Sequence, residues 1–88
     1  MTQLDNIVIV SAVRTAIGSF GGTLKDFQSP NLAANVMKAA IDRVGIHNLF
    51  TQVDDVRFGC CVEDNRFMNV ARIAALRASI PKEVPAVT

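Results

Sequence analysis

Two adjacent cysteines, Cys60 and Cys61, are the residues of this sequence best suited to covalent chemistry. A cysteine attacks a carbonyl carbon as its thiolate, which forms at neutral pH only beside a base or in a positive field. The single histidine, His47, precedes the expected strand that the cysteines follow, so no base is expected beside them. We therefore predict that both cysteines are buried and structural, and that His47 is a surface loop residue. Sequence neighbours rarely form a disulfide, and these three residues have no metal-ligand spacing.

A loop after the first apolar segment carries a second group of polar and small residues: Arg14, Thr15, Gly18, Gly21 and Gly22. An arginine here is able to anchor an anion, but a guanidinium that holds backbone carbonyls is the more common arrangement. The glycine spacing differs from the G-x-G-x-x-G fingerprint, and the loop does not run straight into a helix. We predict that these residues shape the loop and do not cradle a phosphate.

Asn69 and Arg72 are the third candidate pair, at positions i and i+3 of a predicted helix. This spacing places both side chains on one face, where they are able to bond a facing loop or a partner subunit. The acidic neighbours Asp54-Asp55 and Glu63-Asp64 point to opposite faces of an extended chain. We predict that these carboxylates are solvated and do not form acid–base couples.

The elements that position these residues alternate between strand and helix. Asn6–Val13 is almost continuously apolar and rich in Val and Ile, which predicts a central strand covered on both faces. A helix is expected over about Pro30–Val44, with Ser29 as N-cap and Gly45 at the C′ position. Its apolar stripe comprises Ala33, Val36, Met37, Ala40, Ile41 and Val44.

The second half continues the alternation. A strand is clearest at Val56–Cys61, a helix spans about Asn69–Ser79, and a third strand begins at Val84–Thr88. The pattern predicts an α/β fold, a β-α-β-α-β unit with a parallel sheet. The third strand has no natural termination, so we expect an incomplete half-domain over residues 1–88.

Composition limits the possible functions. The chain has 88 residues, a formal net charge of +1 and 50% hydrophobic residues. The charges are dispersed, which argues against nucleic acid or an anionic membrane as partner. No apolar run approaches the ~20 residues of a membrane helix, and no secretory signal is recognisable. We expect a cytoplasmic protein, part of whose apolar surface is covered by another segment or subunit.

Three separated motifs resemble one family. The stretch IVIVSAVRTAIGSFGG is similar to the N-terminal signature of the thiolases, the acetyl-CoA acetyltransferases and 3-ketoacyl-CoA thiolases. VDDVRFGCCV resembles the family segment V-D-E-V-I-x-G-N-V, and NVARIAALRASIPKEVPAVT resembles N-P-A-R-x-A-A-L-x-A-G-I-P-x-x-V-P-A-x-T. Ala16, Cys60 and Val70 depart from these patterns, as does the loop before Asn69, where the family has a glycine-rich stretch.

The resemblance implies the N-terminal half-domain of the thiolase fold and a role in an acyl-CoA acyltransferase. The family makes or cleaves 3-ketoacyl-CoA through an acyl-cysteine, with coenzyme A as substrate and no other cofactor or metal. The segment matching Val84–Thr88 runs in the family into the motif of the nucleophilic cysteine, which Cys60 and Cys61 do not match. The chain is thus expected to be inactive alone, with the remaining polypeptide or a complementary subunit of a homo- or hetero-oligomer as partner. Met68, Asn69 and Arg72 are expected near the active site or the subunit interface.

Two other interpretations remain open. One is a non-catalytic module with the thiolase fold that binds a partner or acyl-CoA. The other is a small nucleotide-binding α/β domain that uses the Gly18–Gly22 loop, although the glycine spacing argues against it.

Overall fold

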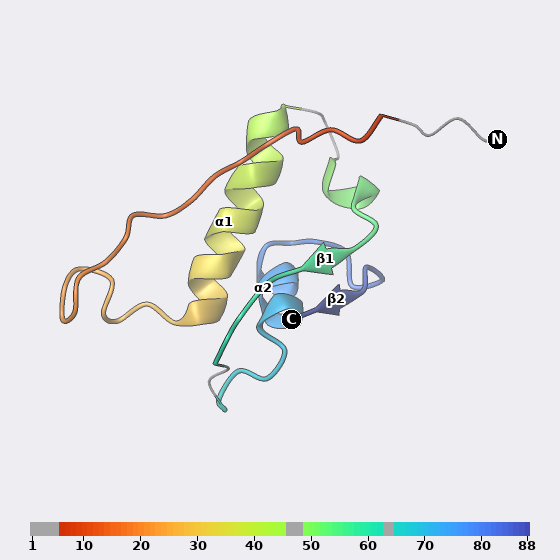
Figure 1. The fold of residues 1–88 in the computed structure, drawn as a ribbon. Helices are drawn as coiled ribbons and strands as arrows, with labels where there is room; N and C mark the ends of the chain where they lie inside the picture. The colour runs from red at the N-terminus through yellow and green to blue at the C-terminus, as the bar shows by residue number, and fades with distance from the viewer. Residues whose placement is uncertain (1–5, 46–48, 63–64) are drawn as a thin grey trace.

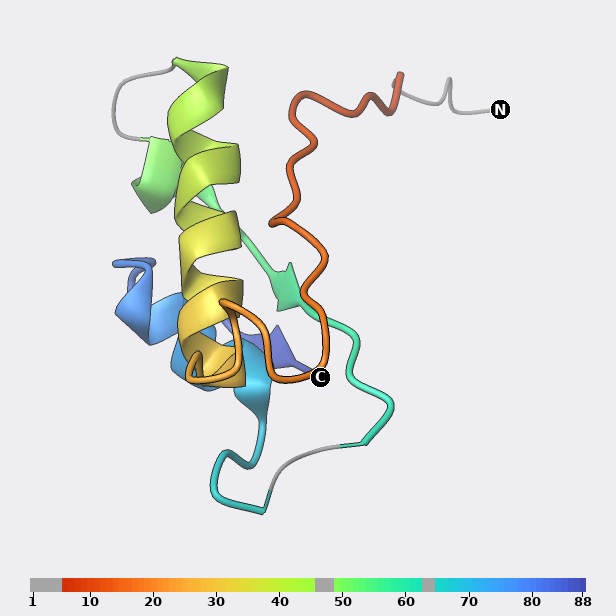
Figure 2. The same ribbon diagram turned by 90° about the vertical axis from the view of Figure 1, so that its left-hand side faces the viewer.

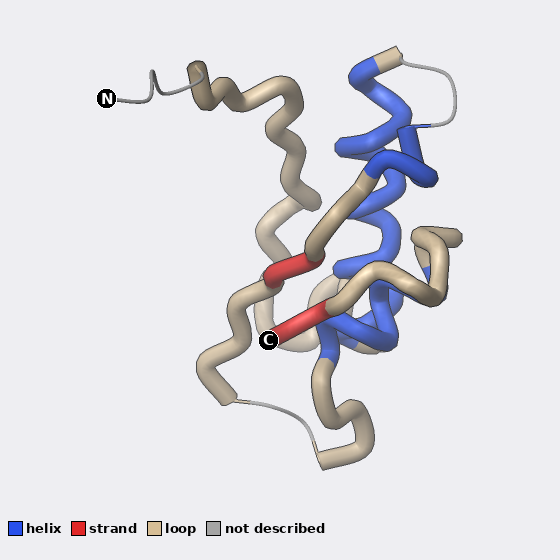
Figure 3. Tube along the Cα trace, turned by 90° about the vertical axis from the view of Figure 1, so that its right-hand side faces the viewer, coloured by secondary structure: helices blue, strands red, loops and turns tan. Residues whose placement is uncertain are grey.

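A computed structural model describes residues 6–45, 49–62 and 65–88 of the chain. Its elements are the helix α1 (Ser29–Val44), the 3-10 helix η1 (Leu49–Gln52), the strand β1 (Val56–Arg57), the helix α2 (Val70–Arg77) and the strand β2 (Ala86–Val87). Opposite views in Figures 2 and 3 show both α-helices on one side of the strand pair. The described part of the chain is therefore a small two-layer α/β arrangement.

The strands pair as the sequence predicts. β1 and β2 are parallel, with Val56 beside Ala86 and Arg57 beside Val87. The Phe58 amide donates to the Val87 carbonyl at 3.1 Å and extends the pairing by one bond. Both strands are shorter than expected, because hydrogen bonding between them stops within one residue beyond this register. The crossover between them is the helix α2, which is the ordinary connection for parallel strands.

Helix α1 follows its apolar stripe. Asn31, Asn35, Lys38 and Asp42 are exposed, as expected for the polar face. Gly45 ends the helix with φ 75°, a left-handed conformation that glycine adopts without steric cost. The prediction of Ser29 as N-cap is wrong by one residue, because the Gln28 carbonyl accepts the first helical bonds, from Asn31 and Leu32.

The core between the helices is built mostly from alanine. Its ten buried apolar residues are Ala33, Ala34, Val56, Val70, Ala71, Ala74, Ala75, Ala78, Ile80 and Val84. Small side chains allow α1 and α2 to approach closely, and Arg77 adds a bond of 2.8 Å from Nη1 to Asn31 Oδ1. Alanine buries little apolar area, so this core supplies less hydrophobic stabilisation than one of Leu and Ile.

The prediction of a buried strand at Asn6–Val13 is wrong for this structure. The segment is extended but joins no strand ladder, and it lies along one side of α1 (Figures 1 and 2). Ile7 and Ile9 are 97% and 90% exposed, and Val8 and Val10 on the other face are 70% and 69% exposed. A strand needs neighbours that accept and donate its backbone hydrogen bonds, and β1 pairs with β2 instead.

This uncovered segment gives the molecule an open shape. The radius of gyration is 14.8 Å, with extents of 53 × 26 × 24 Å. A compact domain of this length has a radius near 12 Å, so this chain is more extended than a compact domain. Neither of the two α-helices in the described residues is long and apolar enough to cross a bilayer.

Candidate functional site

The carboxyl ends of β1 and β2 meet at one edge of the strand pair, because the strands are parallel. Phe58, Gly59 and Cys60 leave β1 at this edge, and Thr88 leaves β2. Open α/β sheets bind ligands beyond the carboxyl ends of their strands. This edge is therefore the place where the described residues are best able to build a site.

Asn69 joins the start of α2 to this edge. Its Oδ1 accepts a bond of 3.3 Å from the Arg72 amide, which caps the helix, and one of 2.8 Å from the Thr88 hydroxyl. Its Nδ2 donates to the Ala86 carbonyl at 3.3 Å. Asn69 has φ 52°, the left-handed region that asparagine tolerates better than most residues. One side chain thus connects the helix N-terminus to the strand β2 and its exit.

Arg72 holds the chain that leads into β2. Nη1 donates to the Val84 carbonyl at 3.0 Å, and Nη2 donates to the Lys82 carbonyl at 2.9 Å. The flat guanidinium binds two carbonyls in a fixed fork, which a lysine cannot reproduce. Asn69 and Arg72 therefore both bond the segment 82–88 that faces them in the same chain. Met68, the third residue of this group, is 65% exposed.

Thr88 is the part of this network that the sequence analysis missed. Its hydroxyl donates to Asn69 Oδ1 and accepts the Ala71 amide at 3.1 Å. The first amides of a helix have no acceptor within the helix, so a side chain that supplies one stabilises its N-terminus. The sequence feature that could have indicated this role is a short hydroxyl side chain at the carboxyl end of an expected strand.

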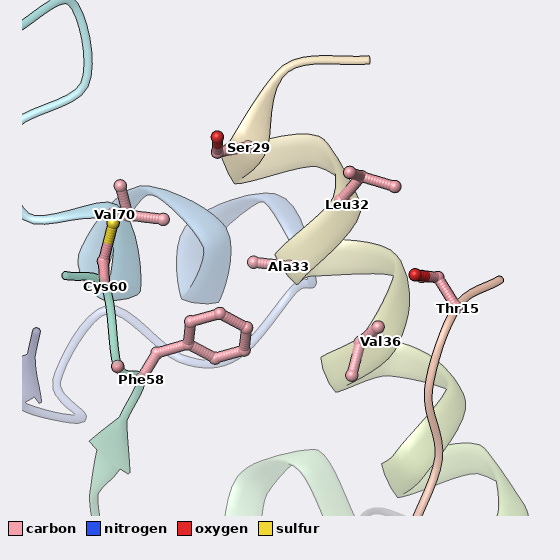
Figure 4. Close-up of a pocket in the computed structure, with 9 residues that line it drawn as sticks. Thr15, Ser29, Leu32, Ala33, Val36, Phe58, Cys60 and Val70 are labelled. Atoms are coloured by element: carbon pink, nitrogen blue, oxygen red, sulfur yellow. The ribbon is translucent and has the colours of Figure 1, made fainter. Parts of the chain in front are cut away.

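An apolar groove of about 300 Å³ lies between α1 and the exit of β1. It is lined by Thr15, Ser29, Leu32, Ala33, Val36, Phe58, Gly59, Cys60 and Val70 (Figure 4). The wall is mostly apolar, with the hydroxyls of Thr15 and Ser29 and the Cys60 thiol as its polar groups. The groove thus lies where the first loop and the end of β1 come close together, although these segments are far apart in sequence.

The prediction of buried cysteines is wrong. Both Cys60 and Cys61 are exposed and free, because β1 ends at Arg57 and the cysteines belong to the loop that follows. The Cys60 thiol donates to the Val62 carbonyl at 3.3 Å. His47 lies outside the described residues. Within the described ranges, no group of three His, Cys, Asp or Glu side chains is able to hold a metal ion.

The first loop is organised by local bonds. Arg14 Nη1 donates to the neighbouring Thr15 carbonyl at 3.0 Å, and the Thr15 hydroxyl donates to the Ala16 carbonyl at the same distance. Gly21 has φ 71° in a turn closed by a bond of 2.8 Å from the Gly22 amide to the Ser19 carbonyl. A Cβ at Gly18 would lie 3.3 Å from the Leu24 side chain. All of these contacts lie within the loop itself.

In the exposed pair Asp54-Asp55, Asp55 forms an ion pair with Arg57. Arg57 Nε donates to Asp55 Oδ2 at 2.9 Å, and both side chains are exposed, that of Arg57 more than that of Asp55. This hydrogen bond lowers the pKa of Asp55 below its ordinary value and raises that of Arg57. Asp54 is exposed, and Glu63-Asp64 lies outside the described residues.

The described residues form an α/β half-domain in which the N-terminus of a helix is bonded to the end of the parallel strand that follows it. The model of the family described as "Thiolase, N-terminal domain" matches residues 7–88. The chain therefore belongs to the thiolase family.

Individual relatives agree with this assignment. The chain is 50% identical to an acetyl-CoA acetyltransferase of Syntrophomonas wolfei over 82 residues, which is 93% of this chain and 20% of the relative. It is 40% identical to a 3-ketoacyl-CoA thiolase of Yersinia pestis, covering 97% and 22% of the two chains. The crystal structure of the Bacillus anthracis acetyl-CoA acetyltransferase superposes with a TM-score of 0.83 at 41% identity, covering 92% of this chain and 20% of that one. The chain thus spans about a fifth of the length of these relatives.

Proposed function

We propose that these residues are the N-terminal part of a thiolase that makes or cleaves 3-ketoacyl-CoA. The observation that carries this proposal is the match of residues 7–88 to the thiolase N-terminal domain, together with the shared fold. Related acetyl-CoA acetyltransferases and 3-ketoacyl-CoA thiolases support a coenzyme A thioester as substrate. In this reaction a cysteine thiolate attacks the thioester carbonyl, coenzyme A leaves, and an acyl-cysteine remains. No metal or further cofactor takes part, and the cytoplasm is the proposed location.

Within the complete enzyme, residues 1–88 have a structural role as part of the N-terminal half-domain. Cys60 and Cys61 do not match the position of the family's nucleophile. The 88 residues alone should therefore not catalyse the reaction. Met68, Asn69 and Arg72 are proposed to lie beside the active site or the subunit interface, while the loop of Arg14, Thr15 and the glycines keeps a shaping role.

The partner in this proposal is the remaining thiolase polypeptide or a complementary subunit, in a homo- or hetero-oligomer. Asn6–Val13 supports this, because its backbone joins no ladder and its apolar side chains are exposed on both faces. A buried strand of this composition requires neighbours that the described residues do not provide. The missing neighbours would come from the four-fifths of the relatives' length that this chain does not span.

The test is a joined polypeptide: these 88 residues followed by the part of the Syntrophomonas wolfei enzyme beyond its matching segment. The assay is coenzyme A-dependent cleavage of acetoacetyl-CoA, with intact-mass detection of an acetyl group after incubation with acetyl-CoA. The controls are the 88 residues alone and the Syntrophomonas wolfei part alone. Activity and acetylation in the joined polypeptide only, on a cysteine beyond Thr88, are the expected results.

A joined polypeptide that folds but neither cleaves acetoacetyl-CoA nor becomes acetylated would contradict the proposal. Binding of acetyl-CoA without acetylation would favour the non-catalytic module instead.

A further inference from the structure

We propose that Thr88 is a positioning residue that fixes the exit of β2, and that Asn69 and Arg72 hold it in place. The inference rests on the proposed function, which places the acyl-accepting cysteine in the chain beyond this exit. The structure shows one hydroxyl, at the carboxyl end of β2, that both donates to Asn69 and accepts from the backbone of α2. That arrangement fixes the position of Thr88, from which the chain of the proposed enzyme would continue.

Thr88 uses its hydroxyl both as a donor and as an acceptor. Donation to Asn69 Oδ1 at 2.8 Å leaves its lone pairs free to accept the Ala71 amide at 3.1 Å. Ala71 is fully buried, and its amide is in the first turn of α2, where no helical carbonyl accepts it. The loss of this acceptor would leave a buried donor unpaired, which costs more than an ordinary surface bond.

The segment before Thr88 is held at successive points along the chain. Arg72 binds the carbonyls of Lys82 and Val84, and Asn69 binds that of Ala86. The turn that leads into β2 and the strand itself are thus both bonded by two side chains from the first turn of α2. The segment cannot slide along α2 without breaking all of these bonds together.

The exits of β1 and β2 share the edge at which parallel α/β folds place their ligands. A nucleophile is effective only when its reacting atom lies within a narrow range of distance and angle, and a displacement of ~1 Å costs about 100-fold in rate. A residue that controls the strand exit should therefore affect the chemical step more than substrate binding.

The experiment compares four forms of the joined polypeptide: unchanged, Thr88→Val, Thr88→Ser and Arg77→Gln. Valine has the shape of threonine without the hydroxyl, and serine restores the hydroxyl. Arg77 is the matched control, since it is an arginine of the same helix that bonds Asn31 of α1 and not the segment before β2. The readouts are kcat and KM for acetoacetyl-CoA cleavage, the rate of acetylation by acetyl-CoA, thermal stability, and hydrogen exchange of a peptide containing Ala71.

We expect Thr88→Val to lower kcat and the acetylation rate by ~10- to 100-fold, with KM within about twofold. Exchange at Ala71 should accelerate, while Thr88→Ser and Arg77→Gln should keep kcat within about threefold of the unchanged enzyme. If Thr88→Val retains kcat, or loses activity only in proportion to its unfolded fraction, the inference is overturned and the proposed function stands. If the unchanged joined polypeptide folds without activity, the proposed function fails and this inference fails with it.

Discussion

Replacement of Asn69 separates the effect of its backbone conformation from that of its side chain. Asn69→Gly keeps the left-handed φ of 52° without strain but removes the cap and the bonds to Ala86 and Thr88. Asn69→Ala removes the same bonds and also places a Cβ in the left-handed region. The two variants therefore differ mainly in backbone strain.

The expected losses of stability follow from these contacts. Loss of the cap to glycine costs only a few tenths of a kcal/mol. The two remaining side-chain bonds are exposed and contribute about 0.5 to 1 kcal/mol each, near the low end for hydrogen bonds. We expect Asn69→Gly to lower the free energy of opening α2 by about 1 to 2 kcal/mol. The left-handed conformation costs alanine about 1 to 2 kcal/mol more.

Native-state hydrogen exchange of peptides from α2, within the joined polypeptide, measures this free energy of opening directly. The order of stability should be unchanged protein, then Asn69→Gly, then Asn69→Ala. Equal exchange for the glycine and alanine variants would refute the argument from backbone strain. Unchanged exchange in both variants would show that the bonds from Asn69 do not stabilise α2.

Three further predictions concern the rest of the chain. The 88 residues alone should associate, since Asn6–Val13 is an uncovered, extended apolar segment. A monomer with a cooperative unfolding transition, seen by light scattering and urea titration, would contradict this. Cys60 and Cys61 should both react with a disulfide reagent such as DTNB in the folded 88 residues, and fewer than two thiols released per chain would show that one is covered. Arg57→Gln should raise the pKa of Asp55 toward its ordinary value, as measured by NMR titration. Because the pKa of Asp55 is lowered in the folded chain, the small stabilisation from this carboxylate is present above the ordinary pKa and is lost as the pH falls through the folded pKa. A pKa of Asp55 that the substitution leaves unaltered would disprove the pairing.

Local structure could be predicted well where a segment carries its own signal. The apolar stripe and the glycine at position 45 define α1 and its end, because both depend on side chains a few residues apart. The alternation of strand and helix gave the α/β class and the parallel pairing. The family motifs were readable for the same reason, as continuous stretches of sequence.

The state of Asn6–Val13 depends on partners that its own sequence does not contain. Its composition is typical of a buried strand, but burial requires neighbouring strands and helices. The exposure of Cys60 and Cys61 has a similar origin, because the point at which β1 ends is set by its pairing with β2.

The sequence by itself determined the helices, the α/β class and the thiolase resemblance, since each rests on residues close together in the chain. Only the tertiary structure decided that Thr88 bonds Asn69 and the Ala71 amide, residues 17 to 19 positions away. It also decided that Arg72 binds the carbonyls of Lys82 and Val84. A hydrogen bond depends on distance and direction in space, and the packing of α2 against β2 sets both.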